Sequence, residues 1–299
     1  MRVPDALLNS VAFIGEVVNV NDDAPEELDF FGTGFFVTHR LHDYSYTFFV
    51  TAKHVASGTD RSERTVRFIA NKKGGGTMNV VMASNRWYFH PSDPTADVAV
   101  MPCRIDAALD VVTIGTDGFL TPERRAELKI GIGDEIVFPG LFTYAPGVRR
   151  NMPLTRRGTI AMIPDDAIQV DEGFAEVYLA EARSISGMSG SPVFVRASIG
   201  IPSRFFGGPT DEQLIAHTSK FQFLGLMHGH WDVKESELNR PHFPPVVKSE
   251  GVNSGLSVIV PAHKILETIT QPEILTLVEE HQAKMRETFF PPHASEDVR

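Results

Sequence analysis

A single serine stands between two glycines in the segment Gly187-Met188-Ser189-Gly190-Ser191-Pro192. The glycines allow a tight turn that a β-carbon would block, and such a turn exposes the serine hydroxyl beside successive backbone N–H groups. A nucleophile beside a pocket for a developing oxyanion is what acyl transfer requires. The alternative is a plain Gly/Ser loop between two strands, because a short motif depends on its context.

A serine hydroxyl is a weak nucleophile at neutral pH, so it needs a general base. Histidine is the usual base because its unperturbed pKa is about 6.5. Of the 11 histidines, His54 is the best placed, since it closely follows the aromatic and β-branched run 44–51. That run predicts a strand. We therefore expect His54 at a strand end, facing a cleft between two rigid β-domains.

The imidazole in turn needs an acceptor that fixes its tautomer and stabilises its cation. Asp97 is the best candidate, because it begins the run Asp97-Val98-Ala99-Val100-Met101 and has no packing reason to precede so apolar a strand. Asp93 is the nearby competitor, but its place between Ser92 and Pro94 is typical of a turn.

Short apolar runs separated by turn residues predict an all-β protein with two six-stranded antiparallel β-barrels. Strands are expected near residues 11–20, 30–37, 44–51, 65–70, 78–82 and 97–101, and again near 135–138, 158–163, 176–180, 192–195, 221–227 and 256–260. The first barrel is expected within residues 1–115 and the second within 116–262. The segments 197–220 and 231–253 are expected to be surface excursions.

After Pro261 the apolar period becomes helical, which predicts helices over 262–268 and 273–289 in a C-terminal extension, 263–299. One stripe at spacings of three and four contains Ile274, Leu277, Val278, His281, Met285 and Phe289. We expect this stripe to pack against the second barrel, and the alternative is that it binds a regulatory protein partner. The tail 291–299 is expected to be disordered.

Three segments resemble, in chain order, the catalytic motifs of chymotrypsin-like (trypsin-fold) serine proteases. They are Thr51-Ala52-Lys53-His54-Val55, Asp97-Val98-Ala99-Val100 and Gly187-Met188-Ser189-Gly190-Ser191-Pro192. The glycine-containing run 32–37 is similar to the strand before the family's histidine. The runs 131–137, 223–226 and 255–261 are similar to segments of the bacterial subgroup of heat-shock proteases and glutamyl endopeptidases. The resemblance covers about residues 10–268.

This resemblance implies a serine endopeptidase that hydrolyses peptide bonds through an acyl-enzyme. It makes Ser189 the nucleophile, His54 the general base and Asp97 its orienting partner. It also assigns the oxyanion hole to the backbone N–H groups of Gly187 and Ser189. Ser191 stands in place of a glycine and is interpreted as structural. The alternative is a catalytically silent trypsin-fold module that binds peptides or a protein partner.

The resemblance also places residues beside the substrate. Leu226, Met227 and His228 belong to the strand expected to form one wall of the substrate pocket and to pair with the substrate backbone. Arg183 and Ser184 precede the nucleophile and are further candidates. Arg183 either brings positive charge into the pocket or points to solvent. In related proteases, a histidine of this strand recognises acidic or glutamine side chains of the substrate. The matching position here is Met227, one residue before His228, and a shift of one residue along a strand reverses the facing. The sequence therefore gives only a weak indication of a preference for acidic or glutamine residues.

The imidazoles of His228, His230 and His242 are zinc ligands by type, but no glutamate or cysteine completes a recognisable spacing. We therefore predict neither a metal nor a cofactor. The only cysteine is Cys103, so no disulfide forms within the chain. It is interpreted as a small buried hydrophobe.

The composition limits the partners. The net charge is −10 and no basic run is longer than two residues, so nucleic acid is not expected as a partner. No apolar stretch approaches the roughly 18 residues of a membrane span, and no signal peptide is evident. Together with the single cysteine, this predicts a cytoplasmic protein whose partners are protein or peptide substrates. A regulated intracellular effector is one possibility for its role.

Overall fold

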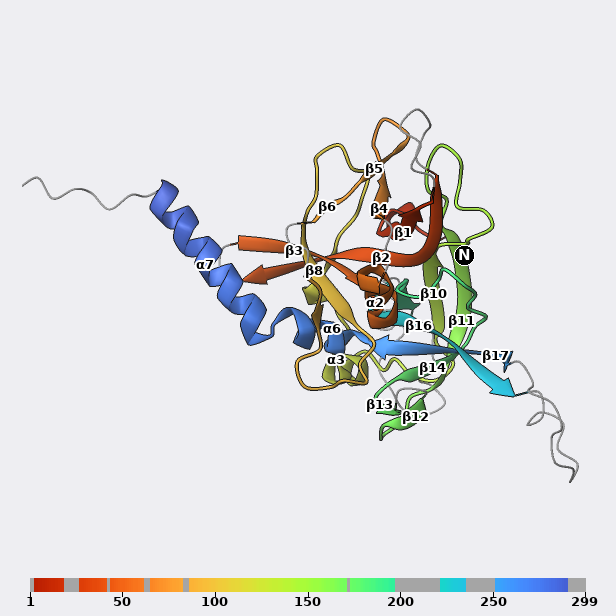
Figure 1. Ribbon diagram of the computed structural model, residues 1–299. Helices are drawn as coiled ribbons and strands as arrows, with labels where there is room; N and C mark the ends of the chain where they lie inside the picture. Colours follow the sequence, from red (N-terminus) through yellow and green to blue (C-terminus); the bar gives the residue numbers. More distant parts are fainter. Residues whose placement is uncertain are drawn as a thin grey trace, which may run out of the picture.

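The computed structural model describes residues 3–18, 27–41, 44–61, 65–82, 86–170, 173–196, 221–234 and 251–289 (Figure 1). Strands are the main secondary structure of these residues, which confirms the all-β fold class predicted from the sequence. The predicted excursion over 197–220, most of the one over 231–253, and the tail 291–299 lie outside the described residues.

The first half of the chain forms a nine-stranded, largely antiparallel sheet. Along its main path the order is β5-β4-β1-β2-β3-β8-β6, with β7 paired to β8 and β9 paired to β2. Six strands were predicted here; the additional ones are pieces of two or three residues, too short to show a period in the sequence. The strands are β1 (Val11–Val17), β2 (Leu28–Leu41), β3 (Tyr44–Thr51), β4 (Val66–Asn71), β5 (Thr77–Asn79), β6 (Val81–Met82), β7 (Tyr88–Phe89), β8 (Ala99–Arg104) and β9 (Ile114–Gly115).

The second half forms the predicted closed barrel of six strands, in the order β10-β11-β14-β17-β16-β15. Its closing strand β17 pairs with both β14 and β16. A separate hairpin of β12 and β13 was not predicted. The strands are β10 (Glu135–Gly140), β11 (Leu154–Met162), β12 (Ile168–Val170), β13 (Gly173–Ala175), β14 (Tyr178–Glu181), β15 (Pro192–Arg196), β16 (Gln222–Lys234) and β17 (Gly251–Pro261).

Few helices accompany the strands. They are α1 (Asp5–Leu8), α2 (Lys53–Arg61), η1 (Thr116–Gly118), α3 (Pro122–Glu127), α6 (Ala262–Ile269) and α7 (Pro272–Phe289). The helix α3 begins after Thr121, whose hydroxyl accepts a hydrogen bond from the Arg124 N–H. The helix α2 was not predicted. It contains Gly58 and Thr59, which are poor helix formers, and it begins directly after β3.

The helix α7 packs against the first half, whereas its apolar stripe was expected to pack against the second barrel. Ile274 and Val278 of α7 are buried in a core cluster with residues of β3 and β8. The Gln282 side chain donates to the carbonyl of Leu41 at the end of β2. Figure 1 shows α7 running past the ends of β2 and β3, away from the second barrel. Leu277, placed in the stripe by its spacing, is 44% exposed. An apolar stripe indicates that a helix is covered, but not which surface covers it.

One of the three apolar clusters of the core spans both halves. Phe194, Phe223 and Val260 of the second barrel belong to the same cluster as the β1–β3 and β8 residues of the first sheet. Phe119, in the connection, packs on Phe223 with ring centroids 4.7 Å apart. This shared core fixes the junction between the halves, where the candidate residues lie.

Candidate active site

The Ser189 segment consists of two successive β-turns. The Met188 N–H donates to the Ile185 carbonyl over 3.1 Å, and the Ser191 N–H donates to the Met188 carbonyl over 3.0 Å. The third residue of each turn is a glycine with positive φ, 90° at Gly187 and 85° at Gly190. Turns of this kind require a positive φ at that position, which glycine adopts without steric cost. Ser189 is therefore the second residue of the second turn, and it is half-buried.

Thr33 of β2 holds this segment against the first sheet. Its hydroxyl donates to the Gly187 carbonyl over 2.7 Å and accepts from the Leu141 N–H over 2.9 Å. Its backbone N–H donates to the Ser189 carbonyl over 3.0 Å, and its own carbonyl accepts from the Thr51 hydroxyl over 2.7 Å. Thr33 is fully buried. One side chain thus fixes the nucleophile candidate relative to both halves.

The backbone of Gly190 lies directly against the end of β3. A β-carbon at this glycine would be 2.0 Å from the Thr33 carbonyl oxygen, 2.3 Å from the Thr51 hydroxyl and 3.2 Å from the Ala52 nitrogen. On its other side, the Gly190 N–H donates to the Met227 carbonyl over 2.8 Å. The turn is therefore inserted between the end of β3, which leads to His54, and β16, which carries His228.

His54 lies in the first turn of α2, where helix N–H groups have no intrahelical acceptor. Its backbone N–H donates to Oδ1 of Asp97 over 2.9 Å, and its ring Nδ1 lies 2.8 Å from Oδ2 of the same carboxylate. The His54 side chain is 44% exposed, whereas that of Asp97 is 9% exposed. The two residues predicted to act together are thus joined by two hydrogen bonds.

A second imidazole contacts the same carboxylate. Nδ1 of His228 lies 2.5 Å from Oδ2 of Asp97, and the rings of His54 and His228 meet edge to face with centroids 5.4 Å apart. Burial disfavours the charged form of Asp97, but the hydrogen bonds from His228 and His54 and the charges of the two imidazoles outweigh it. They hold the pKa of Asp97 well below its usual range. An ionised carboxylate only accepts, so both histidines donate through Nδ1, and a His54 ring without a second proton has its lone pair on Nε2.

The segment that leads to Asp97 is braced by the C-terminal helix α6. Lys264 forms ion pairs with Asp93, 2.9 Å away, and with Glu176 of the second half, 3.2 Å away. Glu267 accepts a hydrogen bond from Nε2 of His90 over 2.7 Å. Asp93 also accepts from the N–H and hydroxyl of Thr95, which is the turn chemistry expected from its neighbours.

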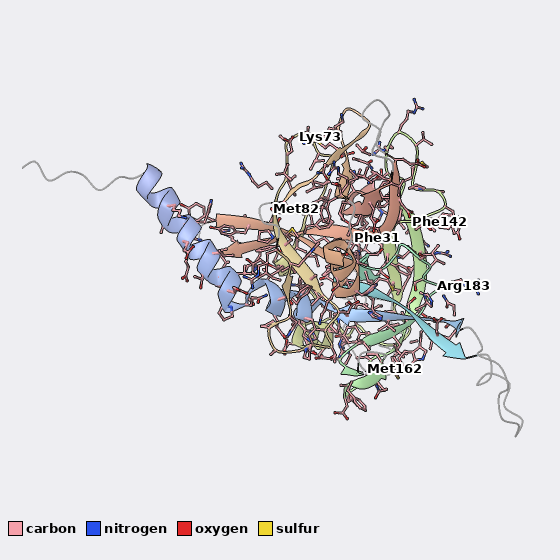
Figure 2. The ribbon with its side chains drawn as sticks, viewed as in Figure 1. Phe31, Lys73, Met82, Phe142, Met162 and Arg183 are labelled. Atoms are coloured by element: carbon pink, nitrogen blue, oxygen red, sulfur yellow. The ribbon has the colours of Figure 1, made fainter. Side chains whose placement is uncertain are left out.

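The residues predicted to line the substrate pocket occupy different environments. Leu226 and Met227 are fully buried, and the Met227 N–H donates to the Ser191 carbonyl over 2.8 Å. Ser184 is buried, and its carbonyl accepts from the Asn253 side chain over 3.0 Å. Arg183 is exposed at the outer edge of the second barrel (Figure 2). No substrate-binding role is assigned by these contacts, so that prediction stays a prediction.

Two N–H groups beside the nucleophile candidate are not engaged elsewhere. Within the described part of the chain, neither the Gly187 N–H nor the Ser189 N–H donates a hydrogen bond. The Ser189 hydroxyl likewise has no hydrogen-bond partner among the described residues. The carbonyls of Gly187 and Met188 are both held by the contacts given above. The turn therefore has donors and a hydroxyl available for a bound group.

Comparisons with known proteins give distant structural likenesses. The protease domain of MamO from Magnetospirillum magneticum, in its apo form, is similar with 12% sequence identity and a TM-score of 0.47, covering 89% of this chain and 98% of that one. The HtrA-type protease AlgW with a decapeptide is similar with 14% identity and a TM-score of 0.49, covering 93% of this chain and 66% of that one. No protein-family model and no curated protein matched.

The chain has an all-β fold of two parts. Its own topology carries this statement, with a largely antiparallel first sheet, a closed six-stranded second barrel and a junction that collects the predicted catalytic residues. A membrane-spanning helix needs a long apolar stretch, and the described helices contain none.

Sequence reasoning missed three contributors to this site. Thr33 was noted only as part of a glycine-containing strand, although a threonine between two glycines in an apolar run was a visible signal. The contact of His228 with Asp97 was not predicted, because strand spacing alone does not tell which face a residue takes. The brace from Lys264 to Asp93 was missed because it joins segments far apart in the sequence.

Proposed function

We propose that the chain is a serine endopeptidase that cleaves protein or peptide substrates through an acyl-enzyme. The observation that carries the proposal is the pair of hydrogen bonds between His54 and Asp97 beside the two-turn Ser189 segment.

In the proposed reaction, Nε2 of His54 takes the hydroxyl proton of Ser189 as the oxygen attacks the substrate carbonyl. Asp97 stabilises the imidazolium that forms. The N–H groups of Gly187 and Ser189 donate to the oxyanion, and one such donor is worth about 10²–10³ in rate. His54 then returns the proton to the leaving amine, and water attacks the acyl-enzyme by the same path. The hydrogen bond between Ser189 and His54 forms with substrate in place, since apo sites are often looser.

A fluorophosphonate probe that modifies activated serines tests the proposal. The wild-type chain is expected to be labelled, and Ser189→Ala and His54→Ala are expected to lose labelling. Ser186→Ala is the matched control, because Ser186 is an exposed serine of the same segment. Labelling that persists in Ser189→Ala would assign the activity to another residue.

One observation favours the second candidate, a silent module that binds peptides. The Ser189 hydroxyl has no described hydrogen-bond partner. Folded wild-type protein that resists the probe, yet binds peptides equally well as Ser189→Ala, would establish this candidate and reject the endopeptidase.

A further inference from the structure

We propose that His54, Asp97 and His228 also form a zinc site, and that Zn²⁺ bound there switches off the proposed protease. Each side chain offers one ligand atom, and the three atoms lie within 4.8 Å of one another. Among the described residues, this is the one group of three or more metal-ligating side chains. The site is distinct from the histidine set at 228, 230 and 242 that the sequence analysis considered.

The donor set suits zinc. Two imidazole nitrogens and one carboxylate oxygen are ordinary zinc ligands, and three protein ligands leave a fourth position for water. The carboxylate compensates part of the cation's charge. Asp97 is already held from its other oxygen by the His54 backbone N–H, so it presents Oδ2 in a fixed position.

To bind zinc, the ligand atoms of the three side chains need to move apart only slightly. Both Nδ1 atoms now approach the same oxygen, at 2.8 Å for His54 and 2.5 Å for His228, with a proton between each pair. A tetrahedral ion with bonds of about 2.0–2.2 Å sets its ligand atoms roughly 3.3 Å apart. Each gap must therefore widen by less than about 1 Å. The His54 side chain is 44% exposed and that of His228 is 22% exposed, so rotation of these rings provides the space.

Zinc bound to Nδ1 changes Nε2 of His54 from a proton acceptor to a proton donor. The metal takes the Nδ1 lone pair, and the proton of the neutral ring moves to Nε2, while water leaves the ion. Nε2 then donates and does not accept, so it has no lone pair for the Ser189 proton. This inhibitory consequence rests on the proposed function, whereas the binding of zinc does not.

Binding is measured by calorimetry with Zn²⁺ and the Ser189→Ala chain, which removes any self-cleavage. We expect one ion per chain, and at least ten-fold weaker binding when His228→Ala or His54→Ala is added. His230→Ala is the matched control, since His230 lies on the same strand and pairs with Asp232 at 3.3 Å. Absence of binding at millimolar zinc, or weakening by His230→Ala with none by His228→Ala, overturns the site. Circular dichroism confirms that each variant is folded.

Inhibition is measured separately on the wild-type chain with the fluorophosphonate probe. We expect zinc to block labelling of Ser189 and EDTA to restore it. The slower labelling expected of His228→Ala should be the same in EDTA and at zinc concentrations that silence the wild type. Zinc that binds Ser189→Ala but leaves wild-type labelling unchanged overturns the inhibition. Wild-type protein that is never labelled, even in EDTA, contradicts the proposed protease, and calorimetry still decides the zinc site.

Discussion

His228 and Asp97 are joined by a hydrogen bond of 2.5 Å, although 131 residues separate them in the chain. Because the carboxylate is nearly buried, this bond supports the orientation in which Asp97 holds His54. We propose that His228 is a positioning residue, acting on the reaction through Asp97.

Replacing His228 with Ala is predicted to lower kcat about 10- to 100-fold and leave KM unchanged, the loss of a hydrogen bond to a charged group worth about 1.5–3 kcal/mol. His228→Asn retains a donor near the Nδ1 position and should recover part of the rate. His230→Ala should match the wild type. Steady-state kinetics in EDTA check this, and an unchanged kcat in His228→Ala would remove the positioning role.

The close approach of Gly190 predicts that Gly190→Ala destabilises the fold and abolishes activity. The added carbon would be 2.0 Å from a backbone carbonyl oxygen, at a φ of 85° that costs an L-residue roughly 1–2 kcal/mol. We expect the free energy of unfolding to fall by at least about 2 kcal/mol. Gly131→Ala, where a β-carbon meets no atom within 4 Å, is the control and should stay within about 0.5 kcal/mol. Equal urea midpoints for the two variants would contradict the steric argument.

The ion pair of Asp93 and Lys264 predicts an acid-sensitive contribution to stability. Burial raises the pKa of Asp93, but hydrogen bonds from Thr95 and Lys264 and the Lys264 charge outweigh it and lower the pKa to about 2. The pKa of Asp93 is therefore lower in the folded chain than in the unfolded chain, where it is near 4. The ionised carboxylate stabilises the fold at pH values above about 4, and this stabilisation is lost as the pH falls toward 2.

Asp93→Asn should therefore reduce the free energy of unfolding by about 1 kcal/mol at pH 7, after allowance for solvent screening. The difference from wild type should shrink between about pH 4 and pH 2. Urea unfolding across this range provides the measurement, with the exposed Asp166→Asn as control. A difference that grows on acidification would show that the sign is wrong.

Cys103 is predicted to be unreactive in the folded chain. It is 7% exposed, and burial raises the pKa of its thiol to about 12. At pH 8 about one thiol in 10⁴ is then ionised, and the thiolate is the nucleophile. We expect iodoacetamide to alkylate one cysteine per chain in urea and almost none under native conditions, measured by mass spectrometry. Similar rates in both conditions would place Cys103 at the surface.

The sequence predicted most of the strands because each is a local pattern. The run 44–51 was predicted with the bounds that β3 has in the structure. The helix α2 could not be predicted, because its composition favours a loop and its formation depends on packing of Val55 and Ala56 into the core. The brief strands of the first sheet have no period of their own and form only because a neighbouring strand supplies hydrogen bonds.

For the site, local motifs singled out His54, Asp97 and Ser189, and the structure gives the first two a direct contact. The part played by His228 depends on which way one strand residue faces, and the bulge in β16 between Met227 and Gly229 alters that facing. The support of Asp93 by Lys264 depends on where a helix docks. Neither the contact of His228 nor that of Lys264 can be predicted from a single segment of the sequence.

Because β17 follows Ser189 in the sequence, the closure of the second barrel determines when the site can form during synthesis. Ribosomes synthesise chains from the N-terminus, so Ser189 emerges well before β17 and α6. Until β17 pairs with β14 and β16 the second barrel stays open, and until Lys264 arrives the segment before Asp97 lacks its brace. A nascent chain therefore carries the three predicted catalytic residues without the structure that aligns them. Any proteolytic activity should begin only after β17 and α6 have been synthesised, which protects the growing chain from self-cleavage.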